Sequence, residues 1–178
     1  TGARGRDFKK CTYGDLGKLE TEDQIAFAKY LGTMPYVDSE RIGIWGWSYG
    51  GYMSSLCITK GADVFKAAMA VAPVTNWKYY DNIYTERYNG LIDENLEGYD
   101  GNSPINFVEK IKGSYFIIHG SGDDNVHVQN TMQMIEKLVQ ADVQFDSFIY
   151  PDKNHGIYGG NTRMHLYRNM TDFILKNL

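Results

Sequence analysis

Apolar residues along the chain fall into two spacings, which predict strands and helices in alternation. Short apolar runs predict four strands, at residues 41–47, 67–71, 114–119 and 145–150. Apolar residues three or four apart predict helices at 21–31, 49–59, 128–140 and 162–175. Gly32 follows the first of these and is expected to cap it. We expect short helices near 77–86 and 104–110, and an irregular segment at 1–14.

This alternation predicts the fold class. Strands that alternate with helices of about 10–15 residues form a mainly parallel sheet flanked by helices, which is an α/β fold. No internal repeat or Pro/Ser-rich linker divides the chain, so residues 1–178 are predicted to form a single domain. Ligands of such sheets bind beyond the carboxyl ends of the strands, and the functional residues are expected there.

Composition narrows the classes of partner. The net charge of −4 is spread over interspersed acids and bases, which argues against a nucleic-acid surface. The longest apolar stretch, residues 67–74, is far shorter than the roughly 18 residues that cross a bilayer. Cys11 and Cys57 have neither redox nor metal spacing, so we expect free thiols and neither a metal nor a cofactor.

The run GWSYG at residues 46–50 carries the first chemical signal. It follows a predicted strand and precedes a predicted helix, the setting of a G-x-S-x-G nucleophile elbow. A serine on such a sharp turn needs small neighbours, which Gly46 and Gly50 are expected to supply. The free N–H groups of the following helix point at the serine and can stabilise negative charge on a substrate oxygen. Ser48 is therefore the candidate nucleophile.

Polar loops after two later strands complete a candidate triad. One loop holds Asp123 and Asp124 after the third strand, and the other holds His155 after the fourth. The order Ser, Asp, His is that of α/β-hydrolase triads, in which an imidazole takes the serine proton and a carboxylate orients the imidazole. Asp123 is favoured because it is nearer the strand end. Asp124 remains an alternative, with a turn or helix-cap role as the other possibility for either aspartate.

Three other histidines compete for the role of base. His119 and His127 lie beside the acid loop, and His165 falls inside the last predicted helix. A surface or packing role is predicted for His165, while His119 and His127 precede or crowd the acid loop. His155 is favoured because its polar loop, just before Gly156, would let the ring reach the elbow.

Four runs together form a more specific pattern than the elbow alone. They are GWSYGGY at 46–52, APV at 72–74, YYDNIYTERY at 79–88 and DDNVH at 123–127. With them the whole chain resembles the catalytic domain of the dipeptidyl peptidase IV branch of the prolyl oligopeptidase family. The resemblance implies a truncated α/β-hydrolase fold and a serine peptidase. Its peptide substrates would carry proline, or less readily alanine, second from a free amino end, and the enzyme would release that dipeptide.

The resemblance also implies roles for individual residues. Ser48 would be the nucleophile, Asp123 the acid and His155 the base, and Tyr49 would offer its backbone N–H to the oxyanion. Asn125 would bind the substrate carbonyl one residue upstream. The proline pocket would be lined by Val74, Trp77, Tyr80, Tyr84 and Val126. Aromatic faces and small aliphatic groups suit a rigid pyrrolidine ring. The alternative is that Trp77, Tyr80 and Tyr84 are the buried face of one helix.

Two parts of the family pattern have no counterpart in this sequence. The family's domain has strands before the segment that residues 2–5 resemble, and a tyrosine there gives a second oxyanion donor. A β-propeller supplies paired glutamates that hold the substrate's amino terminus. We therefore expect this chain to be part of a larger enzyme. Alone it should hydrolyse Gly-Pro-aryl amides barely or not at all, since loss of one oxyanion donor lowers turnover by roughly 100- to 1,000-fold. The strand at 41–47 is expected at a sheet edge, where it would favour self-association.

Two rival functions remain open. The same triad could serve a carboxylesterase or an endo-acting prolyl peptidase, and preference for free over blocked amino termini would distinguish these from a dipeptidyl peptidase. A hydrolase-like domain can also act only in binding, although such a domain is expected to have lost part of its triad. The resemblance to bacterial envelope peptidases suggests a periplasmic or cell-envelope location.

Overall fold

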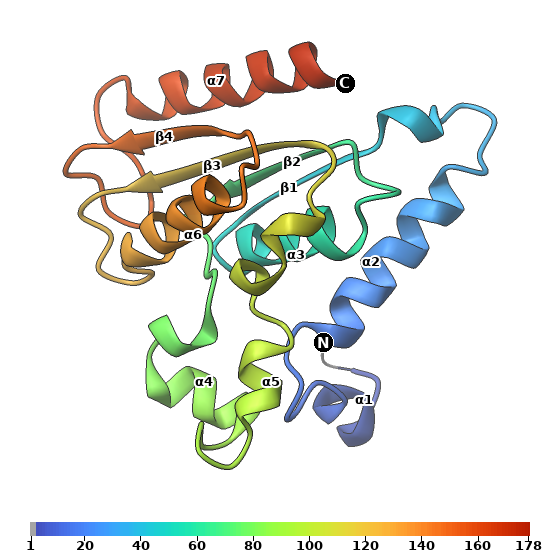
Figure 1. The fold of residues 1–178 in the computed structure, drawn as a ribbon, viewed down its shortest axis with the longest axis vertical. Coiled ribbons are helices and arrows are strands. Elements are labelled where there is room, and N and C mark those ends of the chain that lie inside the picture. The colour runs from blue at the N-terminus through green and yellow to red at the C-terminus, as the bar shows by residue number, and fades with distance from the viewer. Residues whose placement is uncertain (1–2) are drawn as a thin grey trace.

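A four-stranded parallel sheet lies between helices in the computed structural model, which describes residues 3–178 (Figure 1). The strands are β1 (Gly43–Trp47), β2 (Ala67–Val71), β3 (Ser114–Gly120) and β4 (Asp146–Tyr150). Their order in the sheet is their order in the chain, and every neighbouring pair is parallel. The predicted α/β architecture is thereby confirmed.

Helices cover both faces of this sheet. The α7 helix (Thr162–Asn177) lies on one face, while α3 (Tyr49–Lys60) and α6 (Gln129–Gln140) lie on the other (Figure 1). Side chains of β2 alternate between two buried clusters: Ala68 and Ala70 belong to the α3 side, and Met69 belongs to the α7 side. This period of two follows from the pleat of a strand, and it explains why the buried β2 sequence is apolar throughout.

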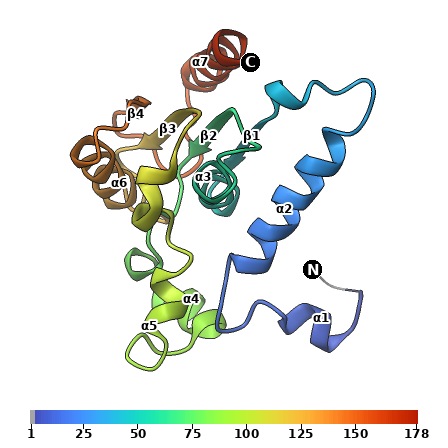
Figure 2. The same ribbon diagram turned by 45° about the vertical axis from the view of Figure 1, so that its right-hand side comes forward.

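The remaining helical segments extend beyond the sheet. They are α1 (Arg6–Lys10), α2 (Lys18–Leu31), α4 (Asn82–Asn89), α5 (Leu96–Asp100) and short 3-10 turns at Ser39–Arg41, Trp77–Tyr79 and Pro104–Lys110. Figure 2 shows α2 on the α3 side of the sheet and α1, α4 and α5 grouped at the end of the molecule away from α7. The α4 helix carries Tyr84, one of the residues of the predicted pocket.

Several predicted boundaries differ from the structure. The α2 helix begins at Lys18 because the Gly17 N–H donates to the Glu20 side chain, which starts the helix three residues early. The segment at 1–14 is not wholly irregular, since it contains α1; residues 1–2 lie outside the described part. The β1 strand begins at Gly43 because Asp38 accepts from the Glu40 N–H and starts a 3-10 turn.

The predicted helix at 77–86 is wrong as a single element. Residues Trp77–Tyr79 form a 3-10 turn, after which Tyr80 has extended backbone angles. The Asp81 carboxylate then accepts from the Tyr84 N–H and begins α4. The α5 helix was not predicted. Because of the break at Tyr80, the aromatic residues of this segment do not form one face of one helix.

No helix within residues 3–178 has the length and apolar character needed to cross a membrane. The envelope location suggested by the resemblance stays a prediction.

The β1 strand has one open edge in the described chain, since its only strand partner is β2. Its Trp45 is 53% exposed, although it lies in the middle of an apolar strand. Open apolar edges pair with other chains, and a lysine on the edge prevents this. We expect sedimentation of this chain at tens of micromolar to reveal dimers or larger species, and Trp45→Lys to shift it towards monomer.

Tyr36→Lys is the matched control, since Tyr36 is 80% exposed in the loop before β1 and not on the strand. A clean monomer for the unmodified chain, or equal effects of the two lysines, would contradict pairing through β1.

Candidate active site

Ser48 lies on the turn that joins β1 to α3. Its backbone angles are φ 58° and ψ −117°, which few non-glycine residues adopt. A residue held in such a region costs about 1–3 kcal/mol, and the strain persists only where the surroundings enforce it. Here the Ser48 N–H donates to the Val71 carbonyl at 2.8 Å, so β2 holds the turn in place. The serine is therefore fixed on a strained turn at the carboxyl edge of the sheet.

Two glycines flank this turn, but only one of them is sterically required. A Cβ on Gly46 would lie 2.2 Å from the Gly50 carbonyl carbon, which no real contact permits. A Cβ on Gly50 would meet nothing within 4 Å. The expectation that both glycines supply room is thus correct for Gly46 and wrong for Gly50.

Gly46→Ala is expected to destabilise the protein by about 3 kcal/mol, because the new methyl group must push apart the backbone of β1 and α3. Gly50→Ala is the matched control and is expected to be neutral or slightly stabilising, since alanine favours a helical position over glycine. Urea unfolding of both variants measures the difference. Equal free energies of unfolding would contradict the close approach at Gly46.

Tyr49 is the first residue of α3, and helix geometry leaves its N–H without an intrahelical acceptor. This donor and the amino end of the helix dipole both favour negative charge beside Ser48. The Tyr49 hydroxyl donates to Glu20 Oε1 at 2.9 Å. Burial, reinforced by the Glu20 charge, raises the pKa of Tyr49 far above its ordinary value, so the ring stays neutral.

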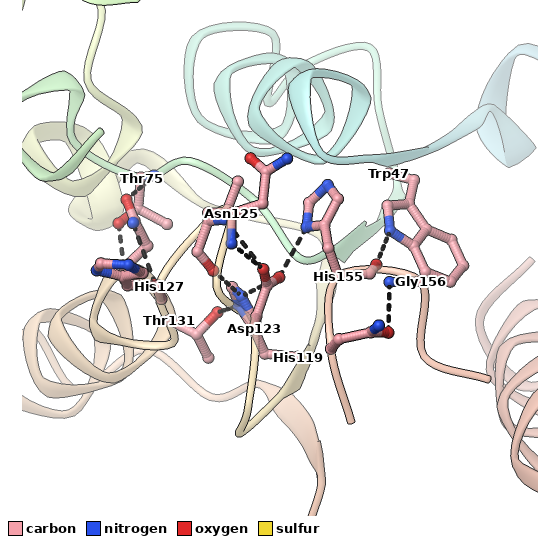
Figure 3. Close-up of polar contacts among 12 residues, drawn as sticks. Trp47, Thr75, His119, Asp123, Asn125, His127, Thr131, His155 and Gly156 are labelled. Atoms are coloured by element: carbon pink, nitrogen blue, oxygen red, sulfur yellow. Dashed lines mark hydrogen bonds and ion pairs between the residues drawn. The ribbon is translucent and has the colours of Figure 1, made fainter. Parts of the chain in front are cut away.

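Asp123 and His155 come from separate loops and meet in a short hydrogen bond (Figure 3). His155 Nδ1 lies 2.7 Å from Asp123 Oδ2, and the Asp123 side chain is fully buried. Asp123 Oδ1 accepts from the backbone N–H groups of Asn125 and Val126 at 2.9 and 3.0 Å. Asp124 is exposed. Of the two candidate aspartates, the structure brings Asp123 to His155.

The hydrogen bonds around Asp123 decide its charge. Burial alone would raise the pKa of Asp123, but hydrogen bonds from His119, His155 and the Asn125 backbone outweigh burial and hold the pKa well below its ordinary value. Asp123 is therefore ionised at neutral pH, as a carboxylate that orients an imidazole must be.

The other histidines have different surroundings. His127 is exposed. His165 lies on α7, where its Nδ1 is 2.8 Å from the Tyr150 hydroxyl, in agreement with a packing role. His119 is fully buried and contacts Asp123, which was not predicted.

His155 is held at its backbone as well as at its ring. The Trp47 indole N–H donates to the His155 carbonyl at 2.9 Å, so the residue before Ser48 holds the loop that carries His155 (Figure 3). Within residues 3–178, His155 Nε2 makes no hydrogen bond and remains open to accept a proton. It does not bond to Ser48 either. In enzymes, catalytic hydrogen bonds often tighten only when substrate is bound, so the missing contact does not rule out His155 as the candidate base.

An aromatic cluster lies beside the elbow, centred on the buried Trp77. Tyr84 stacks on Trp77 with ring centroids 5.8 Å apart, and Tyr80 meets it edge-on at 6.2 Å. The Tyr49 ring lies 6.0 Å from Trp77, which connects the cluster to the residue after Ser48. Burial raises the pKa of Tyr84 to about 12, so this phenol is neutral at physiological pH.

The other predicted pocket residues lie around the same cluster. Val74 and Trp77 belong to one buried cluster together with Val126, whose side chain is fully enclosed. The Tyr80 hydroxyl donates to Asn125 Oδ1 at 2.8 Å, so the exposed Asn125 amide is oriented from the aromatic side. Tyr80 and Asn125 also border an open cleft of about 760 Å³, which neither Ser48 nor His155 lines.

Three contacts of the site were missed by sequence reasoning. They are the bond of Glu20 to Tyr49, the bond of Trp47 to His155, and the burial of His119 against Asp123. The only available signal was the position of His119, a polar residue at the end of an otherwise apolar strand. In the other two pairs, the partners are 29 residues apart (Glu20 and Tyr49) and 108 residues apart (Trp47 and His155), so no local sequence pattern links them.

Comparison with known proteins identifies related sequences and structures. Residues 1–178 match the model of the prolyl oligopeptidase family. The chain is 45% identical to prolyl endopeptidase FAP of Mus musculus, over 98% of this chain and 23% of that protein. It is 46% identical to dipeptidyl peptidase 4 of Felis catus, over 89% of this chain and 21% of that protein.

A solved structure gives the same result. The crystal structure of Porphyromonas gingivalis dipeptidyl peptidase 4 superposes with a TM-score of 0.98 at 53% identity. The superposition covers 100% of this chain and 25% of the P. gingivalis chain. This chain thus spans about a quarter of the length of these relatives, and its sheet and helices match part of an α/β-hydrolase domain.

Proposed function

Because the chain belongs to the prolyl oligopeptidase family and is related to dipeptidyl peptidase 4, we propose that it is the peptidase domain of an enzyme that releases Xaa-Pro dipeptides. Xaa-Ala dipeptides are poorer products. The substrate is a peptide with a free amino end and proline at its second position. In this proposal Ser48, Asp123 and His155 form the catalytic triad.

The reaction proceeds in two halves. His155 Nε2 takes the Ser48 proton as Oγ attacks the carbonyl carbon of the proline residue, and the Tyr49 N–H donates to the resulting oxyanion. The imidazolium gives its proton to the leaving amine, so the peptide bond breaks and a dipeptidyl ester on Ser48 remains. Water then attacks this ester with the same base and releases the dipeptide. Asp123, ionised throughout, stabilises the imidazolium.

The aromatic cluster around Trp77 is the observation that carries the proposal. Trp77 is buried at its centre and packs beneath the partly exposed Tyr80 and Tyr84, and its contact with Tyr49 connects this apolar surface to the elbow. A pyrrolidine ring is rigid and apolar and needs few polar partners, so such a surface suits it better than it suits a charged or long side chain. Asn125, oriented by Tyr80, is the donor for the substrate carbonyl one residue upstream.

A second candidate is an endo-acting prolyl peptidase. It is favoured by one finding: the identity to a protein named prolyl endopeptidase is 45%, almost the same as the 46% to dipeptidyl peptidase 4. Both functions use the same triad and the same proline pocket. They differ in whether the substrate's amino terminus must be free.

Paired substrates test the proposal. The full-length gene product is given Gly-Pro-p-nitroanilide and the same compound with an acetylated amino group, with Gly-Gly-p-nitroanilide as a pocket control. We expect hydrolysis of the first, with kcat/KM at least about 100-fold lower for the other two. Equal rates for free and blocked amino ends would favour the endopeptidase. Preference for a simple ester over all three amides would favour a carboxylesterase.

A further inference from the structure

His119 is a fully buried histidine that the proposed reaction does not use. It lies near the end of β3, and both of its ring nitrogens have partners (Figure 3). Nδ1 lies 2.7 Å from Thr131 Oγ1, on α6. Nε2 lies 2.8 Å from the Val126 carbonyl oxygen and 3.2 Å from Asp123 Oδ2. This oxygen is also the one that His155 Nδ1 contacts.

The partners fix the proton on the ring. The Val126 carbonyl can only accept, so Nε2 of His119 carries a hydrogen and shares it between this carbonyl and Asp123 Oδ2. The neutral ring then accepts at Nδ1 from the Thr131 hydroxyl. In this arrangement both ring nitrogens and the threonine hydroxyl are satisfied, as buried polar groups should be.

Two imidazoles therefore donate to one carboxylate oxygen. The orientation of Asp123 does not need His119, because the backbone N–H groups of Asn125 and Val126 already hold the other oxygen. What His119 adds is a donor that draws electron density from Oδ2. An oxygen that accepts two hydrogen bonds binds a further proton, or an imidazolium, less strongly than one that accepts a single bond.

From this geometry we propose that His119, whose ring Thr131 holds in place, is a positioning residue that acts on His155 through Asp123. Its hydrogen bond to Asp123 Oδ2 weakens the attraction between the Asp123 carboxylate and protonated His155. Its effect is to keep the base unprotonated at lower pH, so that it can accept the Ser48 proton there. The inference rests on the proposed function for its catalytic consequence, but the contacts exist whatever the substrate.

Few charged groups face this site. His119 approaches Asp123 from β3, His155 from the loop after β4, and the Tyr80 phenol from the segment before α4. The exposed Asp124 follows Asp123 in the chain. No lysine or arginine among residues 3–178 forms an ion pair with Asp123. A substitution at His119 should therefore change the titration of this site mainly through the Asp123–His155 pair.

The test compares His119→Leu with His119→Gln. Leucine removes the donor, whereas a glutamine amide can place an N–H near the position of Nε2. In protein labelled with [ε1-¹³C]histidine, the pH midpoint of the His155 signal should rise by about 0.5 to 1 unit in His119→Leu and stay within about 0.2 units in His119→Gln. His155→Gln identifies the signal. This measurement needs no substrate, so it separates a failure of the inference from a failure of the proposed function.

Kinetics give the second measurement. In the full-length gene product, the acid limb of the pH profile of kcat/KM should move to higher pH by the same amount. The kcat/KM of His119→Leu should then be about 3- to 10-fold below that of the unmodified enzyme at low pH and equal to it near pH 8.5. A purely structural role would lower the rate at every pH without moving the limb. If His119→Leu does not fold, Thr131→Val removes the hydroxyl that holds the His119 ring in place and should shift the midpoint in the same direction. An unmoved midpoint in the folded variants, or equal shifts for leucine and glutamine, would overturn the proposal.

Discussion

Ser48→Ala is expected to lower kcat of the full-length gene product for Gly-Pro-p-nitroanilide by about a million-fold, the loss seen when a serine hydrolase loses its nucleophile. Without Oγ no acyl-enzyme can form, and the remaining triad residues have no proton to transfer. Labelling with a fluorophosphonate should also disappear. A variant that keeps more than about 1% of the rate would exclude Ser48 as the nucleophile.

Ser48→Gly separates catalysis from strain at the same position. It should be as inactive as Ser48→Ala, since both lack the hydroxyl. Its φ of 58° is natural for glycine and strained for alanine, so Ser48→Gly should be more stable than Ser48→Ala by about 1 kcal/mol. Urea unfolding measures the difference. If the alanine variant were equally stable, the turn would hold no strain.

The strands could be predicted from the sequence because each contains a short apolar run, and all but β2 are followed closely by polar residues. The β2 strand was predicted to the residue, since all five of its residues are buried and apolar. The α1 and α5 helices were missed because each has five residues, too few to show helical periodicity. The break at Tyr80 was missed although Asp81, a residue typical of helix caps, stands directly after it.

The candidate site was predictable where residues follow strand ends and hidden where contacts are tertiary. Ser48, Asp123 and His155 each stand just after a strand, so the topology of a parallel sheet alone brings them to one edge. The role of His119 was not visible. Its partners Val126 and Thr131 lie 7 and 12 residues away, and they reach the ring only because the loop after β3 and the α6 helix fold back against the end of β3.

Asp123→Asn is expected to lower kcat by about ten-thousand-fold while leaving the fold intact. The amide has the size of the carboxylate, and its oxygen can still accept from the backbone N–H groups of Asn125 and Val126. Its NH₂ group would instead donate to His155 Nδ1, which moves the imidazole proton to Nε2. The base then has no lone pair facing Ser48, and no anion stabilises the imidazolium.

Asp124→Asn is the matched control, since this neighbour is exposed and should change kcat less than about threefold. An equal loss of kcat in Asp124→Asn would identify Asp124 as the acid in place of Asp123.

The stability of Asp123→Asn gives an independent check. Because folding lowers the pKa of Asp123, the ionised carboxylate stabilises the protein above its unfolded pKa of about 4, and this contribution is lost as the pH falls further. The stability advantage of the unmodified protein over Asp123→Asn should therefore be largest above about pH 4 and shrink below it in urea unfolding. A constant difference across that range would show that His119 and His155 do not stabilise the charged form.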